Sequence, residues 1–351
     1  MKISSLLKTV LVAGGLSIAA FSTSASAEVR LIGSGASFPA PIYAKWFKDF
    51  SAANKGVRVD YQSKGSGAGI QDFINQIVDF AGSDAAMSDE DIAKVKNGVV
   101  LLPMTAGEIV LIYNLPGVAE LKLPREVYPA IFAAEITKWN DPKIAAANPG
   151  VTLPDQDITV VVRSDSSGTT YVFTGHLSAV HEGFKSAVGQ GTSPQWPSNP
   201  KLVKSPKNDG VTATVKQTPG AIGYVEYGFA KLTNTPSALL ENKDGFFVAA
   251  GAEAGSAALA SAEFPTGNLP GSEVPDLRAW IFDPTGENAY PIATFTWLLF
   301  PEKQDAAKAK VARDLVEYCL TEGQKSADAM GYVPLPENVI AKVREVAQKI
   351  Q

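Results

Sequence analysis

The sequence is poor in the side chains that most often carry metal or nucleophilic chemistry. Its 351 residues include one cysteine and two histidines. A zinc site needs a set of cysteine, histidine or carboxylate ligands that these residues do not offer, and one cysteine forms no internal disulfide. We therefore expect no metal and no cofactor. Cys319 falls in an apolar helical pattern and is predicted to be a small buried residue.

Long apolar runs are also scarce. The best candidate, from Val10 to Phe21, follows two lysines, is interrupted by small residues and ends before Ala25-Ser26-Ala27. This order is typical of a cleaved secretory signal peptide, assigned to residues 1–27, and the run is too short for a confident membrane span. Cys319 lies far from the cleavage site, so no lipid anchor is expected. We predict a soluble, exported, periplasmic protein.

Positive charge is in the minority. The chain has 31 Lys and Arg against 36 Asp and Glu, and removal of the signal peptide takes away Lys2 and Lys8 but no acid. A net acidic protein is a poor partner for nucleic acid or for an anionic membrane surface. If the ligand is an anion, hydrogen bonds and local dipoles must therefore hold it, not long-range attraction.

What the chain does contain is an alternation of strands and helices. Four short apolar runs each lead into a turn of glycine, serine or acidic residues and then a helix: 29–32, 57–62, 78–81 and 158–162. Ser88 is expected to cap the helix that starts at Asp89. Other strands are expected over 99–103, 108–114, 221–225 and 290–300, and other helices over 211–217, 305–320 and 339–350. This pattern predicts an α/β fold.

The length indicates two domains, because about 320 residues exceed what one core comfortably holds. Leu115-Pro116-Gly117 is a candidate crossover into a second domain, and the strand expected over 290–300 could carry the chain back. We predict a discontinuous domain I of residues 28–112 plus 290–351, and a domain II of residues 113–289. In open α/β sheets, ligands lie beyond the carboxyl ends of the strands.

One such turn combines a fixed cation, a carboxylate and five hydroxyls around one glycine: Arg163-Ser164-Asp165-Ser166-Ser167-Gly168-Thr169-Thr170. It joins a buried strand to a helix, so the first backbone N–H groups of that helix can face an anion. A guanidinium held by Asp165 can still offer its other nitrogens to a tetrahedral oxyanion. The alternative is an ion pair that only shapes the turn.

Asp84 ends another such turn, Gly82-Ser83-Asp84-Ala85. A carboxylate beside an anion is repulsive unless a proton lies between them. An aspartate at an anion site therefore indicates a ligand that still carries an O–H, as phosphate does near neutral pH and sulfate does not. The alternative is that Asp84 only caps the following helix.

Five spaced blocks of the sequence resemble the periplasmic phosphate-binding proteins of the high-affinity phosphate ABC transporter. They are Gly35 to Trp46, Tyr61-Gln62 with Gly65-Ser66, Val78 to Asp84, Arg163 to Thr169, and Pro219 to Tyr227. The resemblance covers essentially the whole mature chain. It implies a type II-like periplasmic binding protein, with two α/β domains joined by crossover strands and a ligand cleft between them. The implied partners are inorganic phosphate and the membrane permease subunits of the transporter, with a monomeric binding protein.

The resemblance also implies a role for each site residue. Phe38, Gly168 and Thr169 would give backbone N–H groups; Ser37, Ser66, Ser167 and Thr169 would give hydroxyls. Arg163, oriented by Asp165, would supply the charged donors, and Asp84 would accept the phosphate proton. The sequence departs from the family pattern at three positions. Ser37 stands where the family often has threonine, Ser166 where it often has glycine, and Gly67 where a second serine is common.

Other functions remain open at this stage. A secreted phosphomonoesterase on the same scaffold would need a catalytic base, but His176 lies on a face with Val172 and Val180 and is predicted to be a packed or surface residue, not a catalytic one. No G-x-S-x-G elbow precedes a helix. A structural or adhesive surface protein is a third class. A binder of another oxyanion such as arsenate stays within the first class, because arsenate carries a similar charge and a proton.

Overall fold

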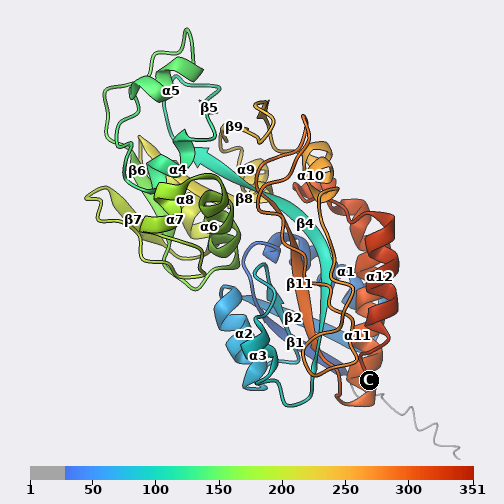
Figure 1. Cartoon of the computed structure of the whole chain (residues 1–351). Helices are drawn as coiled ribbons and strands as arrows, with labels where there is room; N and C mark the ends of the chain where they lie inside the picture. The colour runs from blue at the N-terminus through green and yellow to red at the C-terminus, as the bar shows by residue number, and fades with distance from the viewer. Residues whose placement is uncertain (1–27) are drawn as a thin grey trace, which may run out of the picture.

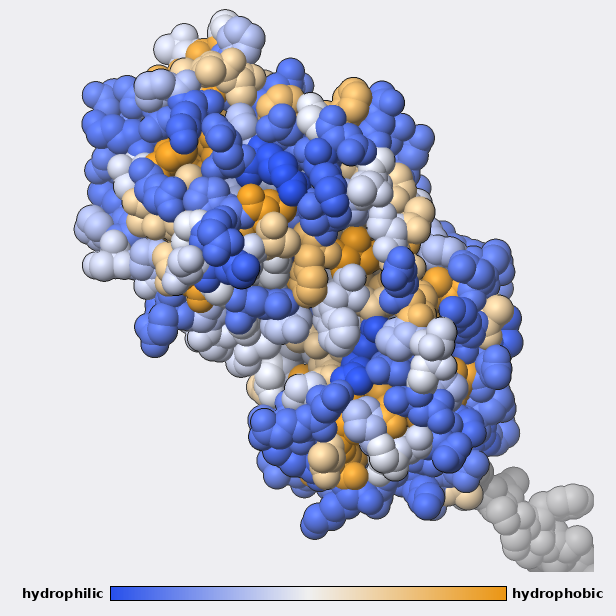
Figure 2. Space-filling view, in the orientation of Figure 1, coloured by the Kyte–Doolittle hydropathy of each residue, from blue (hydrophilic) through white to orange (hydrophobic). Residues whose placement is uncertain are grey.

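The structure, a computed structural model, describes residues 28–351, so the predicted signal peptide lies outside the described residues. An eight-stranded sheet runs through both domains in the order β2-β1-β3-β11-β4-β8-β6-β7. Figure 1 shows one domain around β1 and β2 and the other around β6 and β7. The space-filling view has a narrower waist where they meet (Figure 2). No helix among residues 28–351 is long and apolar enough to cross a bilayer.

The first domain is built on three parallel strands, β1 (Val29–Gly35), β2 (Val57–Ser63) and β3 (Phe80–Ser83). Each strand leads into a helix, as the sequence predicts. These helices are α1 (Ala40–Ala53), α2 (Ser66–Ile74) and α3 (Asp89–Ile92), and the chain ends with α11 (Ala306–Tyr318), a short π-helical segment Cys319–Gly323 and α12 (Glu337–Ala347). The apolar face of α1 explains its packing, because Ile42, Trp46 and Phe50 are buried at helical spacing. Ser88 caps α3 as predicted, since its side chain accepts a hydrogen bond from the Asp91 N–H.

One long strand, β4 (Val99–Tyr113), runs through both domains. It is buried along its whole length, and its Val99–Glu108 part pairs with β11 (Ala293–Pro301) in the first domain. Its Ile109–Tyr113 part pairs with β8 (Ala221–Glu226) in the second. Two separate runs were predicted here, but the residues between them do not break the strand, because it is buried throughout and pairs with β11 on one part and β8 on the other. The pairing register shifts between Thr296 and Trp297 of β11.

In the second domain β6 (Thr159–Arg163) lies between β8 and β7 (Leu202–Ser205) and is parallel to both. Its helices are α4 (Val127–Phe132), α5 (Pro142–Ala147), α6 (Gly168–Val180), α7 (Glu182–Ala187), α8 (Lys207–Gln217) and α9 (Tyr227–Thr233). A small sheet contains β10 (Phe247–Val248), β9 (Leu239–Glu241) and β5 (Lys122–Leu123), and α10 (Ala252–Leu259) follows β10. The helix expected from residue 211 begins at Lys207.

Candidate functional site

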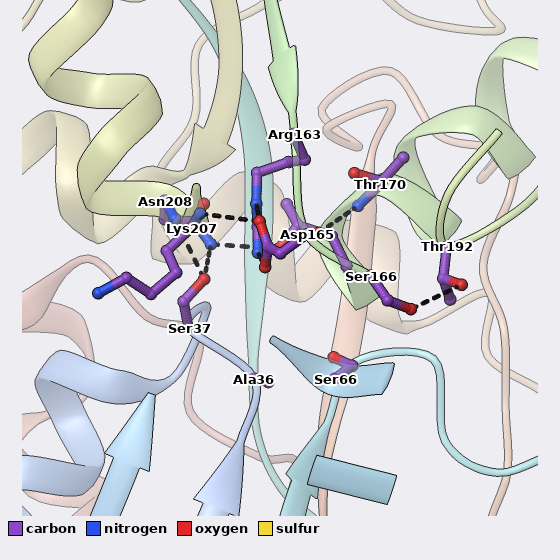
Figure 3. Close-up of polar contacts among 12 residues, drawn as sticks. Ala36, Ser37, Ser66, Arg163, Asp165, Ser166, Thr170, Thr192, Lys207 and Asn208 are labelled. Carbon is purple, nitrogen blue, oxygen red and sulfur yellow. Dashed lines mark hydrogen bonds and ion pairs between the residues drawn. The ribbon is translucent and has the colours of Figure 1, made fainter. Parts of the chain in front are cut away.

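The turns that follow four strands meet where the two domains face each other. From the first domain come Ser37 after β1, Ser66 after β2 and Asp84 after β3, and from the second comes the Arg163 turn after β6. Figure 3 shows Arg163, Asp165 and Ser166 opposite Ala36, Ser37 and Ser66. The predicted site residues are thus brought to one place, at the carboxyl ends of the strands, as open α/β sheets arrange their sites.

Arg163 supplies the positively charged side chain of the site. Its Nε and Nη2 atoms donate to the two carboxylate oxygens of Asp165 at 2.8 and 2.5 Å. The side chain is 1% exposed, and its Nη1 is a buried nitrogen without a hydrogen-bond partner among the described residues. A buried donor on a charged group costs free energy unless it meets an acceptor, so Nη1 is available for an anion.

Asp165 accepts hydrogen bonds from the Arg163 guanidinium and from the backbone of Lys207. Its Oδ1 accepts a second hydrogen bond, 2.9 Å long, from the backbone N–H of Lys207. Burial raises the pKa of this carboxyl, but the hydrogen bonds and charge of Arg163 outweigh burial, and the pKa lies below its usual value. Asp165 is therefore ionised at neutral pH and fixes the plane of the guanidinium.

Asp84 is 1% exposed and lies among hydroxyls. Its Oδ1 accepts a 2.9 Å hydrogen bond from Thr296 of β11, and its Oδ2 lies 3.4 Å from the hydroxyl of Thr169. Burial raises the pKa of Asp84 to about 7, against the opposing effects of the Thr296 hydrogen bond and the Arg163 charge. Near neutral pH, this carboxyl can either hold a proton or accept one from a ligand.

The remaining donors come from the starts of loops and of α6. Ser167 caps α6, because its side chain accepts from the Thr170 N–H at 3.0 Å. This leaves the backbone N–H groups of Phe38, Gly168 and Thr169 without a hydrogen bond to any other described residue. The hydroxyls of Ser37, Ser66 and Thr169 are buried beside them. The arrangement offers many donors and one titratable acceptor, which suits an anion that carries one proton.

The domains are in direct contact around these donors. A β-carbon added at Gly168 would lie 2.3 Å from the Ser66 Oγ and 2.9 Å from the Asp84 Cβ. A larger residue at position 168 would therefore hold the domains apart.

Sequence reasoning missed two side chains that touch the site, Asn208 and Thr296. Asn208 lies in the first turn of α8, three residues before the stretch 211–217 that was predicted to be helical. Thr296 lies within an apolar strand and shows no sign of a site in the sequence. Two predictions about other residues are confirmed. Cys319 is fully buried, and His176 is buried with its Nε2 2.8 Å from the Tyr128 hydroxyl and its Nδ1 2.6 Å from the Phe282 carbonyl oxygen.

Residues 28–351 contain no cluster of three or more His, Cys, Asp or Glu side chains that could hold a metal ion.

Comparisons with known proteins show the family to which the chain belongs. A family model described as the PBP superfamily domain matches residues 22–322. The phosphate-binding protein PstS of Xylella fastidiosa (strain Temecula1) is 37% identical over 319 residues, which cover 90% of this chain and 84% of that protein. The PstS protein of Pasteurella multocida is 39% identical over 319 residues, with 90% and 88% covered. The chain belongs to the PstS family of phosphate-binding proteins.

Solved structures show the same fold. A high-affinity periplasmic phosphate-binding protein bound with phosphate, PfluDING, superposes with a TM-score of 0.72 at 23% identity, covering 90% of this chain and 93% of that one. The phosphate-binding protein from Stenotrophomonas maltophilia gives a TM-score of 0.71 at 22% identity, with 90% and 93% covered. The predicted fold class, two α/β domains of the type II-like periplasmic binding protein kind, is confirmed.

Proposed function

We propose that this protein binds inorganic phosphate in the periplasm and delivers it to the permease subunits of a phosphate ABC transporter. The proposal rests on two buried, charged side chains that lie in the same site, Arg163 and Asp84. Arg163 has a buried, unpartnered Nη1 among the described residues, and Asp84 is a buried carboxyl whose pKa is raised to about 7. A permanent cation holds the anion, and a carboxylate that can share a proton selects an anion with an O–H.

The ligand contacts proposed here are those expected from the sequence. Backbone N–H groups of Phe38, Gly168 and Thr169 and the hydroxyls of Ser37, Ser66, Ser167 and Thr169 donate to the phosphate oxygens. Arg163 donates through Nη1, while Asp165 keeps it in place. Charge-assisted hydrogen bonds contribute about 1.5 to 3 kcal/mol each, so roughly ten of them leave room for micromolar or tighter binding after desolvation and closure.

The Asp84 carboxyl can bind phosphate in two protonation states. Monoanionic phosphate can bring its own proton to an ionised Asp84, and the dianion can meet a protonated Asp84. Both routes give the same complex, with one proton between the Asp84 carboxyl and a phosphate oxygen. Sulfate has no proton to share near neutral pH, so it gains this contact only when Asp84 itself is protonated.

Closure of two domains over the ligand would make the bound form distinct from the empty one. We assign residues 28–112 and 290–351 to domain I and residues 113–289 to domain II, with the site contributed by both. The closed form is then the form that the permease recognises, because only the closed form presents both domains in a fixed orientation. The protein acts as a monomer, and its acidic balance disfavours nucleic acid as a partner.

We expect no enzymatic activity. His176 is held by Tyr128 and Phe282 and does not face the site, so hydrolysis of a phosphate ester lacks a histidine base there. A phosphomonoesterase on this scaffold is the alternative from another class. Arsenate is an alternative ligand, since it has the same shape and the same proton.

Titration calorimetry on residues 28–351 tests the proposal. Phosphate should bind one to one with a dissociation constant at or below the micromolar range, equimolar sulfate at pH 8 should not displace it, and nitrophenyl phosphate should not be hydrolysed. Displacement of phosphate by equimolar sulfate would refute the role of Asp84. An absence of phosphate binding would refute the proposed function, and release of nitrophenol would favour the esterase.

A further inference from the structure

Asn208 touches the site from α8 and is fully buried. Its Nδ2 donates to the Ser37 hydroxyl oxygen at 2.9 Å and to the Thr169 hydroxyl oxygen at 3.2 Å. Its backbone N–H donates to the same Ser37 oxygen at 3.1 Å. One residue of the second domain thus contacts one hydroxyl from each domain, and Figure 3 shows the contact with Ser37.

The amide of Asn208 can face only one way. Its Oδ1 accepts a 2.9 Å hydrogen bond from the backbone N–H of Glu226. Glu226 is the last residue of β8 and pairs with Ile109 of β4, so the sheet that joins the domains fixes this N–H. Because the amide oxygen is committed to an N–H donor, the amide nitrogen is turned toward Ser37 and Thr169.

This orientation decides what the two hydroxyls can do. A hydroxyl has one hydrogen to donate and two lone pairs to accept with. The Ser37 oxygen accepts two hydrogen bonds from Asn208, so both lone pairs are used and its own hydrogen must point elsewhere. The Thr169 oxygen accepts one bond, and its hydroxyl donates to the Asp84 Oδ2, 3.4 Å away. Both hydroxyls are therefore held as donors.

We infer that Asn208 is a positioning residue that turns the Ser37 hydroxyl into an obligatory donor to the anion and holds the Thr169 hydroxyl as a donor, which in this structure donates to Asp84. Without it, each hydroxyl could rotate and present a lone pair to a phosphate oxygen, which is repulsive. Asn208 also joins the domains through Ser37, so the donors are aligned only when the cleft is closed. The inference rests on the proposed function and deepens it, because Asn208 acts through the residues proposed to bind phosphate.

Two substitutions separate this role from simple packing. Asn208→Asp keeps the shape and the acceptor for the Glu226 N–H, but it replaces the Nδ2 donor by an oxygen that captures the two hydroxyl hydrogens. Asn208→Leu keeps the volume and removes both functions. We expect phosphate to bind about 10- to 100-fold more weakly to Asn208→Leu, and still more weakly to Asn208→Asp. A packing role predicts the opposite order, because aspartate is the closer match in shape.

Asn242 provides a matched control. It is equally buried, and its Nδ2 donates to the carbonyl oxygens of Gly286, Glu287 and Ala289, away from the site. Asn242→Leu and Asn242→Asp should lower the melting temperature and leave the dissociation constant for phosphate unchanged. The same pair of substitutions at two buried asparagines then separates loss of stability from loss of ligand contacts.

A double-mutant cycle with Ser37→Ala tests the mechanism directly, by phosphate titration calorimetry on residues 28–351. If Asn208 acts through Ser37, Asn208→Leu should cost much less in the Ser37→Ala background than in the wild type. Additive losses, or equal binding by wild type and Asn208 variants, would overturn this inference while the proposed function stood. Ser37→Ala alone should weaken binding even if Asn208→Leu proves unstable, and Asn208→Asp then completes the cycle. A wild-type protein without phosphate binding would overturn both.

Discussion

The backbone N–H of Gly67 donates a 3.1 Å hydrogen bond across the cleft to the carbonyl oxygen of Ser166. A β-carbon added at Gly67 would lie 2.0 Å from the Ser166 Oγ and 2.5 Å from its Cβ. The Ser166 hydroxyl in turn donates to the Thr192 hydroxyl at 3.0 Å. Two of the departures from the family pattern therefore face each other, and the absence of a side chain at position 67 makes room for the one at position 166.

We predict that Gly67→Ser weakens phosphate binding by tenfold or more. The new side chain would overlap Ser166 in the closed arrangement, so the domains could not approach as closely and the donors on one side would move away from the anion. Position 67 lies in the first turn of α2, where serine is tolerated, so the melting temperature of the ligand-free protein should change little. Calorimetry and thermal unfolding of the same preparation check both parts.

The double variant Gly67→Ser with Ser166→Gly is the control. This variant places the serine side chain at position 67 and leaves none at position 166, so the two positions no longer overlap. Phosphate binding should return to within about threefold of the wild type. If the double variant binds as weakly as Gly67→Ser alone, the contact between positions 67 and 166 does not limit closure.

A second prediction concerns the guanidinium of Arg163. Arg163→Lys retains the charge, but an ammonium cannot bond both oxygens of Asp165 and also present a fixed donor to the ligand. We expect the dissociation constant for phosphate to rise at least 100-fold in Arg163→Lys, and further in Arg163→Ala, because the buried charge of Asp165 then loses its partner. Asp165→Asn should lie between wild type and Arg163→Lys. Equal affinity of all four proteins would mean that the Arg163–Asp165 pair only shapes the turn.

A third prediction concerns Asp84 and sulfate. In Asp84→Asn the amide can donate to a ligand oxygen, so the ligand no longer needs a proton. The preference for phosphate over sulfate should fall at least tenfold at pH 8. In the wild type, sulfate should begin to compete as the pH falls below about 7, where Asp84 gains its own proton. Competition calorimetry at pH 8, 7 and 6 checks this, and a sulfate affinity that did not change with pH would contradict it.

The same substitution should stabilise the empty protein. Because burial raises the pKa of Asp84 above the value in an unfolded chain, its contribution to stability is full below about pH 4 and is lost as the pH rises through 7. Asp84→Asn does not titrate, so its free energy of unfolding should exceed that of the wild type at pH 8 by up to about 4 kcal/mol. The difference should vanish near pH 4. Urea unfolding without phosphate measures it.

The sequence predicts the site well where the site lies in turns that follow strands. Arg163, Asp165, Ser37 and Asp84 each follow a short apolar run, and parallel strands bring their carboxyl ends to a common edge, so spacing along the chain is enough to place them together. The roles of individual residues came from resemblance to a family. Their part in binding phosphate remains a prediction.

The site side chains that the sequence did not predict contact residues far from them in the sequence. Thr296 reaches Asp84 because β11 returns from the far end of the sequence to lie between β3 and β4. Asn208 reaches Ser37 only because the two domains meet. The length of β4 was also missed, because Pro103 and Gly107 suggest breaks, while pairing with β11 on one part and β8 on the other keeps the strand continuous. These contacts join residues that are far apart in the sequence, so the pattern of neighbouring residues does not predict them.

The last prediction concerns acid stability and His176, which lies behind the site on α6. Its Nδ1 donates to the Phe282 carbonyl oxygen, and in the neutral ring its Nε2 accepts from the Tyr128 hydroxyl. Burial lowers the pKa of His176 to about 4, from about 6.5 in an unfolded chain. The stability that this neutral ring contributes is full above pH 6.5 and is lost as the pH falls toward 4, by up to about 3 kcal/mol.

His176→Gln should therefore be less stable than the wild type at pH 7 but should lose less stability between pH 6.5 and 4. His181→Asn is the control, because His181 caps α7 through an acceptor that asparagine can replace. Urea unfolding at four pH values measures each slope. If His176→Gln loses stability as steeply as the wild type, the buried ring does not set the acid sensitivity, and the buried carboxylates or their ion pairs must do so instead.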